Sequence, residues 1–213
     1  MNKKELKKLI SNLPATPGVM GRERFFNSAV LIPFIKIDGE YFILFQKRAK
    51  HIRQGGDICF PGGGFEPEDK SFMHTALRET KEELGIKKKD IKILGQLDTM
   101  VATFGAIVEP FVGLVKKRAL KNMKVDPREV EKTLLIPLDF FKSHEPEVYN
   151  LRSEVKPYHI DAEGNKEVYL PSAQLGLPEA YHEPWGHKKH RIYVYKYEGE
   201  VIWGMTAVII NDL

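Results

Sequence analysis

Cysteine is nearly absent from this chain, which holds Cys59 alone among 213 residues. One thiol excludes an intramolecular disulfide framework and is typical of a reducing compartment. Because Cys59 lies in an apolar run before Phe60, we expect a buried structural thiol and not a nucleophile. No apolar run reaches membrane-spanning length, and residues 1–13 combine lysines with Leu6, Leu9 and Ile10 without a cleavage-like segment. These absences predict a cytoplasmic protein that begins with a short amphipathic helix.

A strong excess of charge is also missing, because the formal net charge is only +4 and the basic residues are dispersed. The lysine-rich stretches at 87–89 and 116–118 lack interleaved aromatic residues, so we interpret them as solvated turns. The sequence therefore predicts neither a nucleic-acid nor a membrane partner. With 42% apolar residues and no internal repeat, residues 1–213 are expected to form one domain. Residues 1–24 would be an N-terminal extension.

Apolar and β-rich segments recur along the chain between turn signals, of which Asp38-Gly39 and Glu198-Gly199 are the clearest. The expected strands are 25–37, 41–46, one near Ile58, 91–102, 107–116, 131–138, 191–197 and 201–203, with helices at 139–142 and from 204 to about 211. Mixed strands with helices on their faces predict an α+β fold, an α/β/α sandwich around a mixed β-sheet.

Three carboxylates with helical spacing follow a glycine loop. The loop is Phe60-Pro61-Gly62-Gly63-Gly64, and the carboxylates are Glu79, Glu82 and Glu83. Residues at i, i+3 and i+4 converge on one helical face, where clustered oxygen ligands suit Mg²⁺ or Mn²⁺. Asp69 or Ser71 would cap the start of this helix and Gly85 its end. The alternative is a set of solvated charges that pair with neighbouring lysines, but the glycine loop and Arg78 favour a metal site.

Residues 64–86 resemble the Nudix box: Gly, five residues, Glu, seven residues, Arg-Glu, apolar, any, Glu-Glu, any, Gly, apolar. In register are Gly64, Arg78, Glu79, Glu82, Glu83, Gly85 and Ile86. Two positions depart from the pattern, because Lys70 stands at the first glutamate and Thr80 at the apolar position. Glu66 or Glu68 would offer a substitute carboxylate.

The resemblance also implies roles for the box residues. Glu79 and Glu83 would be the principal metal ligands, with Glu82 as a further ligand or orienting group. Arg78 would hold a glutamate in a fork-shaped salt bridge. A backbone carbonyl of Gly63 or Gly64 would complete the ligand set.

Two further blocks resemble the coenzyme A pyrophosphatase branch of the Nudix family. The first comprises Arg48, Ala49, Arg53, Gly56 and the block Phe60-Pro61-Gly62-Gly63, but it is one residue short between Arg53 and Gly56 and has Gln46 in place of threonine. The second is Trp203-Gly204-Met205-Thr206-Ala207, which in that branch opens the last helix. The resemblance implies that Arg48 and Arg53 contact substrate phosphates beside Gly62 and Gly63. The alternative for both arginines is ordinary surface charge.

The resemblance implies a Mg²⁺- or Mn²⁺-dependent hydrolase that directs water at a phosphoanhydride. The general base would be a box glutamate, or from outside the box Glu109 first and Glu129 second, each with a surface salt bridge as its alternative. Three functions stay open: a coenzyme A pyrophosphatase, a Nudix hydrolase of ADP-ribose or dinucleoside polyphosphates, and a non-catalytic nucleotide sensor. A small-molecule nucleotide is the expected partner. A homodimer is compatible with the family, because some members complete each pocket from a second subunit.

Residues 142–190 have an unusual composition, with five of the seven histidines between His144 and His190. We expect an insertion or long loop that folds over the site as a specificity lid, with a further strand candidate at 149–160. Tyr181 or Trp185 would stack on an adenine. A second metal site at His182, His187 and His190 is the less favoured interpretation, since no cysteine accompanies them.

Overall fold

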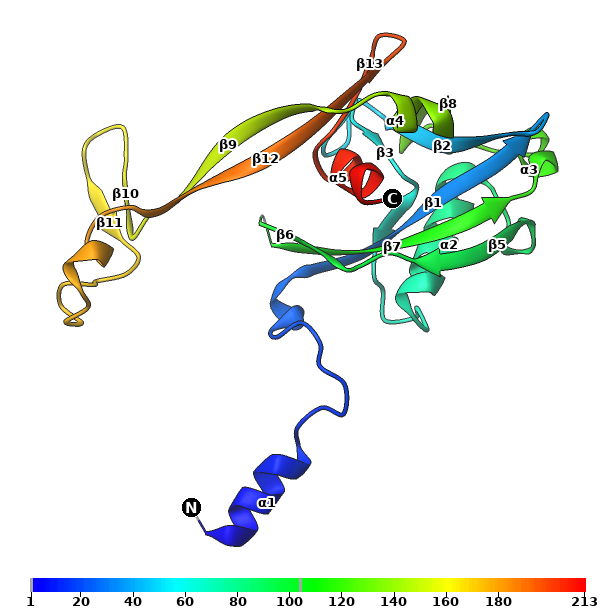
Figure 1. Ribbon diagram of the computed structural model, residues 1–213. Helices are drawn as coiled ribbons and strands as arrows, with labels where there is room; N and C mark the ends of the chain where they lie inside the picture. The colour runs from blue at the N-terminus through cyan, green and yellow to red at the C-terminus, as the bar shows by residue number, and fades with distance from the viewer. Residues whose placement is uncertain (1, 104) are drawn as a thin grey trace. The chain divides into compact units, whose positions relative to one another are not determined.

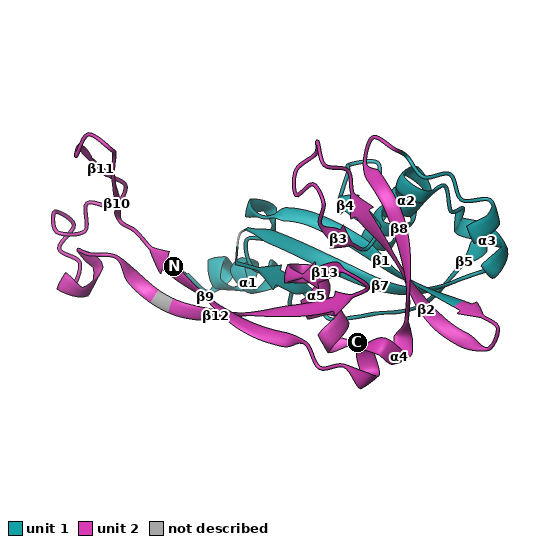
Figure 2. Cartoon of the chain, turned by 90° about the horizontal axis from the view of Figure 1, so that it is seen from above, with its two compact units in different colours: residues 1–35, 60–126 teal, residues 36–59, 127–213 magenta. Residues whose placement is uncertain are grey.

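The structure is a computed structural model that describes residues 2–103 and 105–213, with the side chain of His187 outside the description. The chain divides into two compact units (Figure 2): unit 1 holds Met1–Ile35 and Phe60–Asp126, and unit 2 holds Lys36–Cys59 and Pro127–Leu213. The expectation of one domain over 1–213 stays a prediction. Among the described residues, no helix is both long and apolar enough to cross a membrane.

Unit 1 is built around a mixed β-sheet. Strand β1 (Phe26–Ile37) runs parallel to β7 (Ala106–Val115) and antiparallel to the short glycine strand β4 (Gly62–Gly64). On its other side β7 pairs antiparallel with β5 (Ile91–Gln96) and β6 (Met100–Ala102). Parallel and antiparallel pairs in one sheet, together with the helices, confirm the predicted α+β class.

Helix α2 (Phe72–Leu84) carries the box glutamates, and both of its ends follow from local sequence. Of the two predicted caps, Ser71 is the N-cap, since its hydroxyl accepts the backbone N–H of His74 at 3.2 Å. Gly85 ends the helix in the left-handed conformation, with φ of 69°. The buried face of the helix includes Ala76, which packs with Ala29, Leu31 and Phe111 of the sheet. This packing fixes α2 beside β4 and β7.

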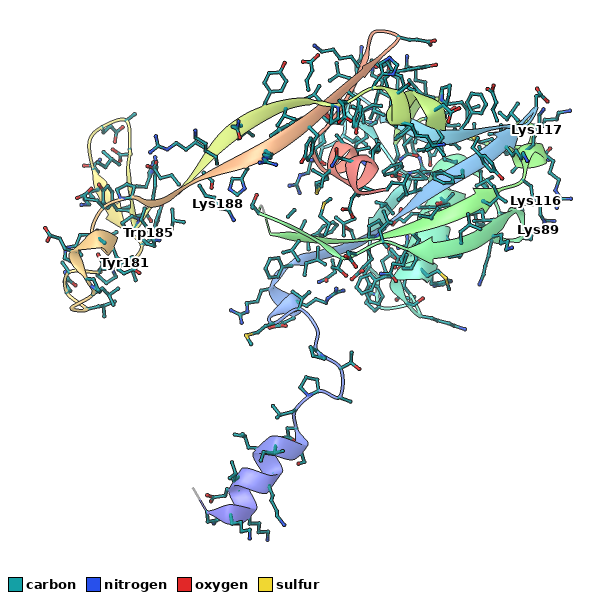
Figure 3. All side chains as sticks on the ribbon, in the orientation of Figure 1. Lys89, Lys116, Lys117, Tyr181, Trp185 and Lys188 are labelled. Carbon is teal, nitrogen blue, oxygen red and sulfur yellow. The ribbon has the colours of Figure 1, made fainter. Side chains whose placement is uncertain are left out.

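The two lysine-rich stretches meet at one end of unit 1, around the 3₁₀ turn η2 (Lys88–Asp90) and helix α3 (Lys117–Lys121). Figure 3 shows Lys89, Lys116 and Lys117 close together there, and the Lys116 ammonium donates to the carbonyl of Lys89 at 2.9 Å. Arg118 pairs with the buried Asp90 at 2.7 Å. The predicted solvated turns are therefore exposed, but they share one surface.

The N-terminal part of unit 1 begins with helix α1 (Lys3–Ser11), which agrees with the short helix expected there. Asn2 and Glu5 form a capping box at its start, and none of its residues is buried. A 3₁₀ turn, η1 (Arg22–Arg24), then leads into β1.

The described strands of unit 2 pair with one another in antiparallel orientation. Strand β2 (Glu40–Arg48) pairs with β8 (Val130–Pro137) and with the short β3 (Ile58–Cys59), and helix α4 (Leu138–Ser143) follows β8. Phe141 of α4 packs between Phe45 and Tyr195, with ring centroids 5.9 and 5.2 Å away. Cys59 lies at the end of β3 and is only partly buried, so the expectation of a buried thiol was wrong. As the second residue of a two-residue strand, it does not reach the interior.

The second half of unit 2 is a long β-ribbon, and the strand candidate at 149–160 lies within its strands. Its two strands are β9 (Glu147–Val155) and β12 (Trp185–Tyr197), which pair antiparallel. Between them lie the hairpin of β10 (Tyr158–Ile160) and β11 (Lys166–Val168) and the turn η3 (Glu179–Tyr181). Strand β12 continues through the predicted Glu198-Gly199 turn into β13 (Glu200–Trp203) and helix α5 (Gly204–Asp212). Figure 1 shows the ribbon from yellow-green to orange.

Candidate functional site

Arg78 on α2 is held by an aspartate that the sequence pattern did not single out for this role. Its Nε donates to Asp69 Oδ1 at 3.1 Å and its Nη2 to Asp69 Oδ2 at 3.0 Å, a two-pronged ion pair. Asp69 also accepts the Thr75 hydroxyl at 2.8 Å and the Glu66 backbone N–H at 3.1 Å. The Asp69 side chain is 1% exposed, so this carboxylate is a buried anchor for the arginine.

The anchor corrects one expectation. The substitute for the missing glutamate at position 70 is Asp69, one residue earlier, and neither Glu66 nor Glu68; the exposed Glu66 approaches Arg78 only to 3.6 Å. The two-pronged contact of Arg78 is with Asp69, and Arg78 also forms the expected ion pairs with box glutamates, each through Nη1 alone. The guanidinium of Arg78 holds the pKa of Asp69 far below its usual range, and the same hydrogen bonds raise the pKa of Arg78.

The third nitrogen of Arg78 reaches the box glutamates. Nη1 donates to Glu79 Oε1 at 2.9 Å and to Glu82 Oε2 at 3.0 Å, and Nη2 also donates to the carbonyl of Gly64 at 2.9 Å. Anchored at Asp69, the arginine therefore orients two carboxylates and one end of the glycine strand. Thr80 stands where the box pattern has an apolar residue, and the helix accommodates it because its buried hydroxyl donates to the Ala76 carbonyl at 2.6 Å.

Two of the predicted metal ligands face the glycine strand β4. The buried Glu83 accepts the backbone N–H of Gly62 at 2.9 Å. A Cβ placed on Gly63 would lie 2.4 Å from Glu79 Oε1, so only glycine lets that carboxylate approach the strand. Gly62 is equally constrained, since its Cβ would lie 2.3 Å from the carbonyl oxygen of Ala29. The structure thus gathers Glu79, Glu83 and the glycines at one place.

Hard oxygen donors at this place have the chemistry that a divalent cation requires. Glu82 is the most accessible of the three glutamates, with a side chain that is 54% exposed, whereas Glu79 is 14% exposed. In the part of the chain that the structure describes, no group of three or more His, Cys, Asp or Glu side chains is already arranged around a common point. The box carboxylates are instead oriented by Arg78 and by the glycine backbone.

Glu109 on β7 lies in a separate network of unit 1. Arg22 forms an ion pair with one of its oxygens, and Gln96 and Thr99 donate to the other at 2.7 and 2.8 Å. The Glu109 side chain is 5% exposed and lines an open pocket of about 750 Å³. Other lining residues are Pro17, Val19, Phe72, Met73 and Phe111. The sequence did not link Arg22 to Glu109, because 87 residues separate them.

The remaining predicted residues lie in unit 2. Arg48 at the end of β2 donates from Nε to the carbonyl of Arg53 at 3.1 Å, so the two arginines belong to one tight loop. In that loop a Cβ on Gly55 would lie 2.4 Å from the Lys50 carbonyl oxygen. The Trp203 indole N–H donates to Asp57 Oδ1 at 3.1 Å, which joins the arginine loop to the C-terminal Trp-Gly block. Glu129 is exposed on the loop before β8.

The model of the NUDIX domain family matches residues 26–152, a stretch that takes in segments of both units. This chain belongs to the Nudix family. An uncharacterized Nudix hydrolase, NudL, of Photorhabdus laumondii is 33% identical over 187 residues, which cover 88% of this chain and 82% of the relative. An uncharacterized Nudix hydrolase NudL of Yersinia pestis is 31% identical, with 94% of this chain and 87% of the relative covered.

Solved structures of Nudix proteins resemble parts of the chain more distantly. A Caenorhabditis elegans Ap4A hydrolase binary complex has a TM-score of 0.45 at 19% identity, over 53% of this chain and 80% of that one. The NUDIX domain of Shewanella oneidensis NrtR, crystallised with ADP ribose, has a TM-score of 0.44 at 18% identity, over 67% and 88%. As a Nudix hydrolase, this chain is a pyrophosphohydrolase of nucleoside-diphosphate-linked substrates, and Nudix enzymes generally use divalent metal ions.

The aromatic and histidine residues of the ribbon belong to unit 2, whereas the box belongs to unit 1. Tyr181 and Trp185 pack edge to face with ring centroids 5.4 Å apart, at the end of the ribbon (Figure 3). His190 contacts Ser153 at 2.6 Å, and His182 contacts the Leu177 carbonyl at 3.0 Å. The side chain of His187 lies outside the described residues. The second metal site at His182, His187 and His190 is therefore not tested.

Proposed function

We propose that this Nudix hydrolase cleaves coenzyme A, or its acyl derivatives, at the diphosphate to give 3′,5′-ADP and (acyl-)4′-phosphopantetheine. One observation carries the choice of substrate. The two sequence blocks that resemble the coenzyme A branch are about 150 residues apart in the chain and meet in unit 2 through the 3.1 Å hydrogen bond from Trp203 to Asp57. A contact between the two blocks is what a shared substrate-recognition role requires.

Glu79 and Glu83, with the Gly63 carbonyl, would hold the metal ion, which we propose to be Mg²⁺ or Mn²⁺. When bound, it supplies Lewis-acid stabilisation of the diphosphate and lowers the pKa of water. Glu79 fits this role because Gly63 leaves room for its carboxylate against the backbone. Glu83 fits because the backbone N–H of Gly62 orients its buried carboxylate.

Arg78 serves as a positioning residue, since its Nη1 contacts Glu79 and Glu82 together. Glu82, with an exposed carboxylate, is proposed to bind the metal or to take the proton from the attacking water. Glu109 stays a prediction as the base: Arg22, Gln96 and Thr99 donate to three of the roughly four lone-pair sites of its carboxylate, which leaves about one for a proton. The water attacks one of the two phosphorus atoms, the bond from that phosphorus to the bridging oxygen breaks, and the other half of the substrate leaves as a phosphate. No covalent enzyme intermediate forms.

Arg48 and Arg53 are proposed to bind substrate phosphates, and Gly62 and Gly63 are proposed as further substrate-binding residues. The hydrogen bond between Arg48 Nε and the Arg53 carbonyl leaves the terminal nitrogens of Arg48 for a ligand. The lid role of residues 142–190, the adenine-stacking role of Tyr181 or Trp185 and the cytoplasmic location stay predictions. The homodimer also stays a prediction.

The test is a substrate panel of coenzyme A, acetyl-coenzyme A, ADP-ribose and diadenosine tetraphosphate, each with Mg²⁺ or Mn²⁺. Products are identified by mass, and Glu83→Gln serves as the blank. Release of 3′,5′-ADP with coenzyme A at least tenfold preferred in kcat/KM supports the proposal. A preference for ADP-ribose or the dinucleotide overturns the choice of substrate, and no turnover on any of them favours the nucleotide-sensor alternative.

A further inference from the structure

Helix α1 carries an apolar stripe that the described residues leave uncovered. Leu6, Leu9, Ile10 and Leu13 follow the i, i+3, i+4, i+7 spacing of one helical face, and each is between 41% and 64% exposed. All of residues 2–18 are exposed, so no residue of this segment is buried against the rest of unit 1. In a globular protein such a stripe normally faces the core. The stripe of α1 is therefore available to an external partner.

The rest of the helix surface is basic. Four lysines, at positions 3, 4, 7 and 8, stand against one acid, Glu5, whose carboxylate accepts the Asn2 backbone N–H in the capping box. The helical pitch places the apolar stripe on an arc of roughly 100°, and all four lysines lie outside this arc. A strong separation of apolar and basic sides is typical of helices that lie in a membrane interface.

A groove on another protein fits this helix less well. Sites where proteins dock on one another depend mainly on tryptophan, tyrosine and arginine anchors, and α1 contains none of these residues. Lysine carries a compact, strongly hydrated charge on a flexible stem, which suits a diffuse negative surface better than a paired contact with one carboxylate. Its stem can also lie along apolar surface while the charge stays in water. The composition of both sides of α1 therefore favours a lipid surface.

We propose that α1 binds the surface of a membrane that contains anionic lipids. The leucines and the isoleucine enter the boundary between headgroups and acyl chains, and the lysines stay at the level of the lipid phosphates. At about 1.5 Å per residue, the nine residues of α1 span about 14 Å, less than half of a hydrocarbon core of about 30 Å. The helix consequently lies along the surface and does not cross it.

This partner departs from the expectation of no membrane partner that the sequence supported. The expectation rested on the small net charge of the whole chain and on the lack of a long apolar run. Neither property bears on a short helix that lies along a surface, because such a helix needs only a local excess of lysine beside an apolar stripe. The match to the NUDIX model starts at residue 26, so α1 lies outside the matched domain.

Sedimentation with lipid vesicles tests the attachment. The full chain should bind vesicles of phosphatidylcholine with about 30% phosphatidylglycerol at least tenfold more tightly than vesicles of phosphatidylcholine alone. The double variant Leu9→Gln/Ile10→Gln should weaken binding to the anionic vesicles at least tenfold, because two apolar side chains no longer gain burial. Leu94→Gln on β5, where the leucine is 51% exposed, is the matched control and should bind like the unaltered chain.

A fluorescent label tests which side of the helix meets the lipid. Cys59→Ser removes the native thiol, and a polarity-sensitive dye is then attached to Leu9→Cys on the stripe or to Ser11→Cys on the opposite side. On anionic vesicles the emission of the dye at position 9 should shift to the blue, and the emission at position 11 should not.

Three results overturn the proposal: no binding of the unaltered chain, equal binding of Leu9→Gln/Ile10→Gln, or equal shifts at positions 9 and 11. Light scattering without vesicles adds a fourth. If Leu9→Gln/Ile10→Gln lowers the molar mass of the protein in solution, the stripe is covered by a second copy and the membrane is not its partner. None of these measurements uses a substrate, so their outcome is independent of which substrate is cleaved.

Discussion

The ion pair between Asp69 and Arg78 makes a prediction that combines stability and activity. Replacing the carboxylate in Asp69→Asn keeps the size of the side chain but removes its charge. An amide nitrogen would then face at least one donor, because both carboxylate oxygens accept hydrogen bonds from Arg78. The change leaves a guanidinium that is only 18% exposed without its main counter-charge.

Removing one partner of a buried ion pair costs about 3–5 kcal/mol. Arg78 keeps its contacts with Glu79, Glu82 and the Gly64 carbonyl, so we place the loss at the lower end, about 3 kcal/mol. Loss on that scale is a large part of the stability of an ordinary domain, about 5–15 kcal/mol. Turnover should fall as well, because Arg78 loses the anchor that aims its third nitrogen at two box glutamates.

Urea unfolding followed by tryptophan fluorescence at pH 7 measures the difference, with Glu68→Gln, a neighbouring exposed carboxylate, as the control. The dependence on pH gives a second readout. The pKa of Asp69 is lower in the folded state than its unfolded value of about 3.9, so its stabilisation is complete well above that value and is lost as the pH falls below about 4. Asp69→Asn should lack this part of the acid sensitivity. Unfolding within 0.5 kcal/mol of the unaltered protein at pH 7 would refute the anchor role of Asp69.

Three further substitutions test the glycine strand and the carboxylates. Gly63→Ala should lower turnover on the order of 100-fold and weaken the Mn²⁺ binding measured by calorimetry, because the new Cβ would lie 2.4 Å from Glu79. Gly95→Ala is the control: its Cβ would have nothing within 4 Å, so it should change neither turnover nor Mn²⁺ binding. Glu83→Gln should abolish metal-dependent hydrolysis while the melting temperature stays within a few degrees; near-normal turnover would remove Glu83 from the ligand set. Glu109→Gln separates two roles of this side chain. If Glu109 is the general base, the variant should have a lower kcat and unchanged stability. If Glu109 only accepts hydrogen bonds from its three donors, the variant should lose about 2 kcal/mol of unfolding free energy in urea and keep a nearly unchanged kcat.

Local signals predicted those parts of the fold that neighbouring residues determine. Ser71 and Gly85 bound α2 as expected, because a hydroxyl cap and a left-handed glycine act within one helical turn. The turns at Asp38-Gly39 and Glu198-Gly199 have positive φ at both residues, the conformation that an Asp-Gly sequence favours. Apolar, β-rich runs located the central strands β1 and β7, which are buried along most of both faces and therefore show no alternation.

The sequence did not predict the ribbon as a whole, and the reason is physical. In β9 both faces are exposed, so burial imposes no alternation that a sequence pattern would reveal. Strand β12 was expected from Arg191 but begins at Trp185, because its first residues pair only with β9. In the site, the contacts of Arg22 with Glu109 and of Trp203 with Asp57 join residues 87 and 146 positions apart, which no local pattern specifies.

The anchoring carboxylate lies at position 69 and not at position 70. This reverses which of the two positions should tolerate substitution. Judged by the box pattern, Lys70 looks like the damaging change and Asp69 like an unconstrained neighbour. In the folded chain Lys70 is exposed, and the nearly fully buried Asp69 supplies the charge. Variants of this gene should therefore be scored by the position that a carboxylate occupies in space, so that a change at 70 is tolerated and one at 69 is damaging.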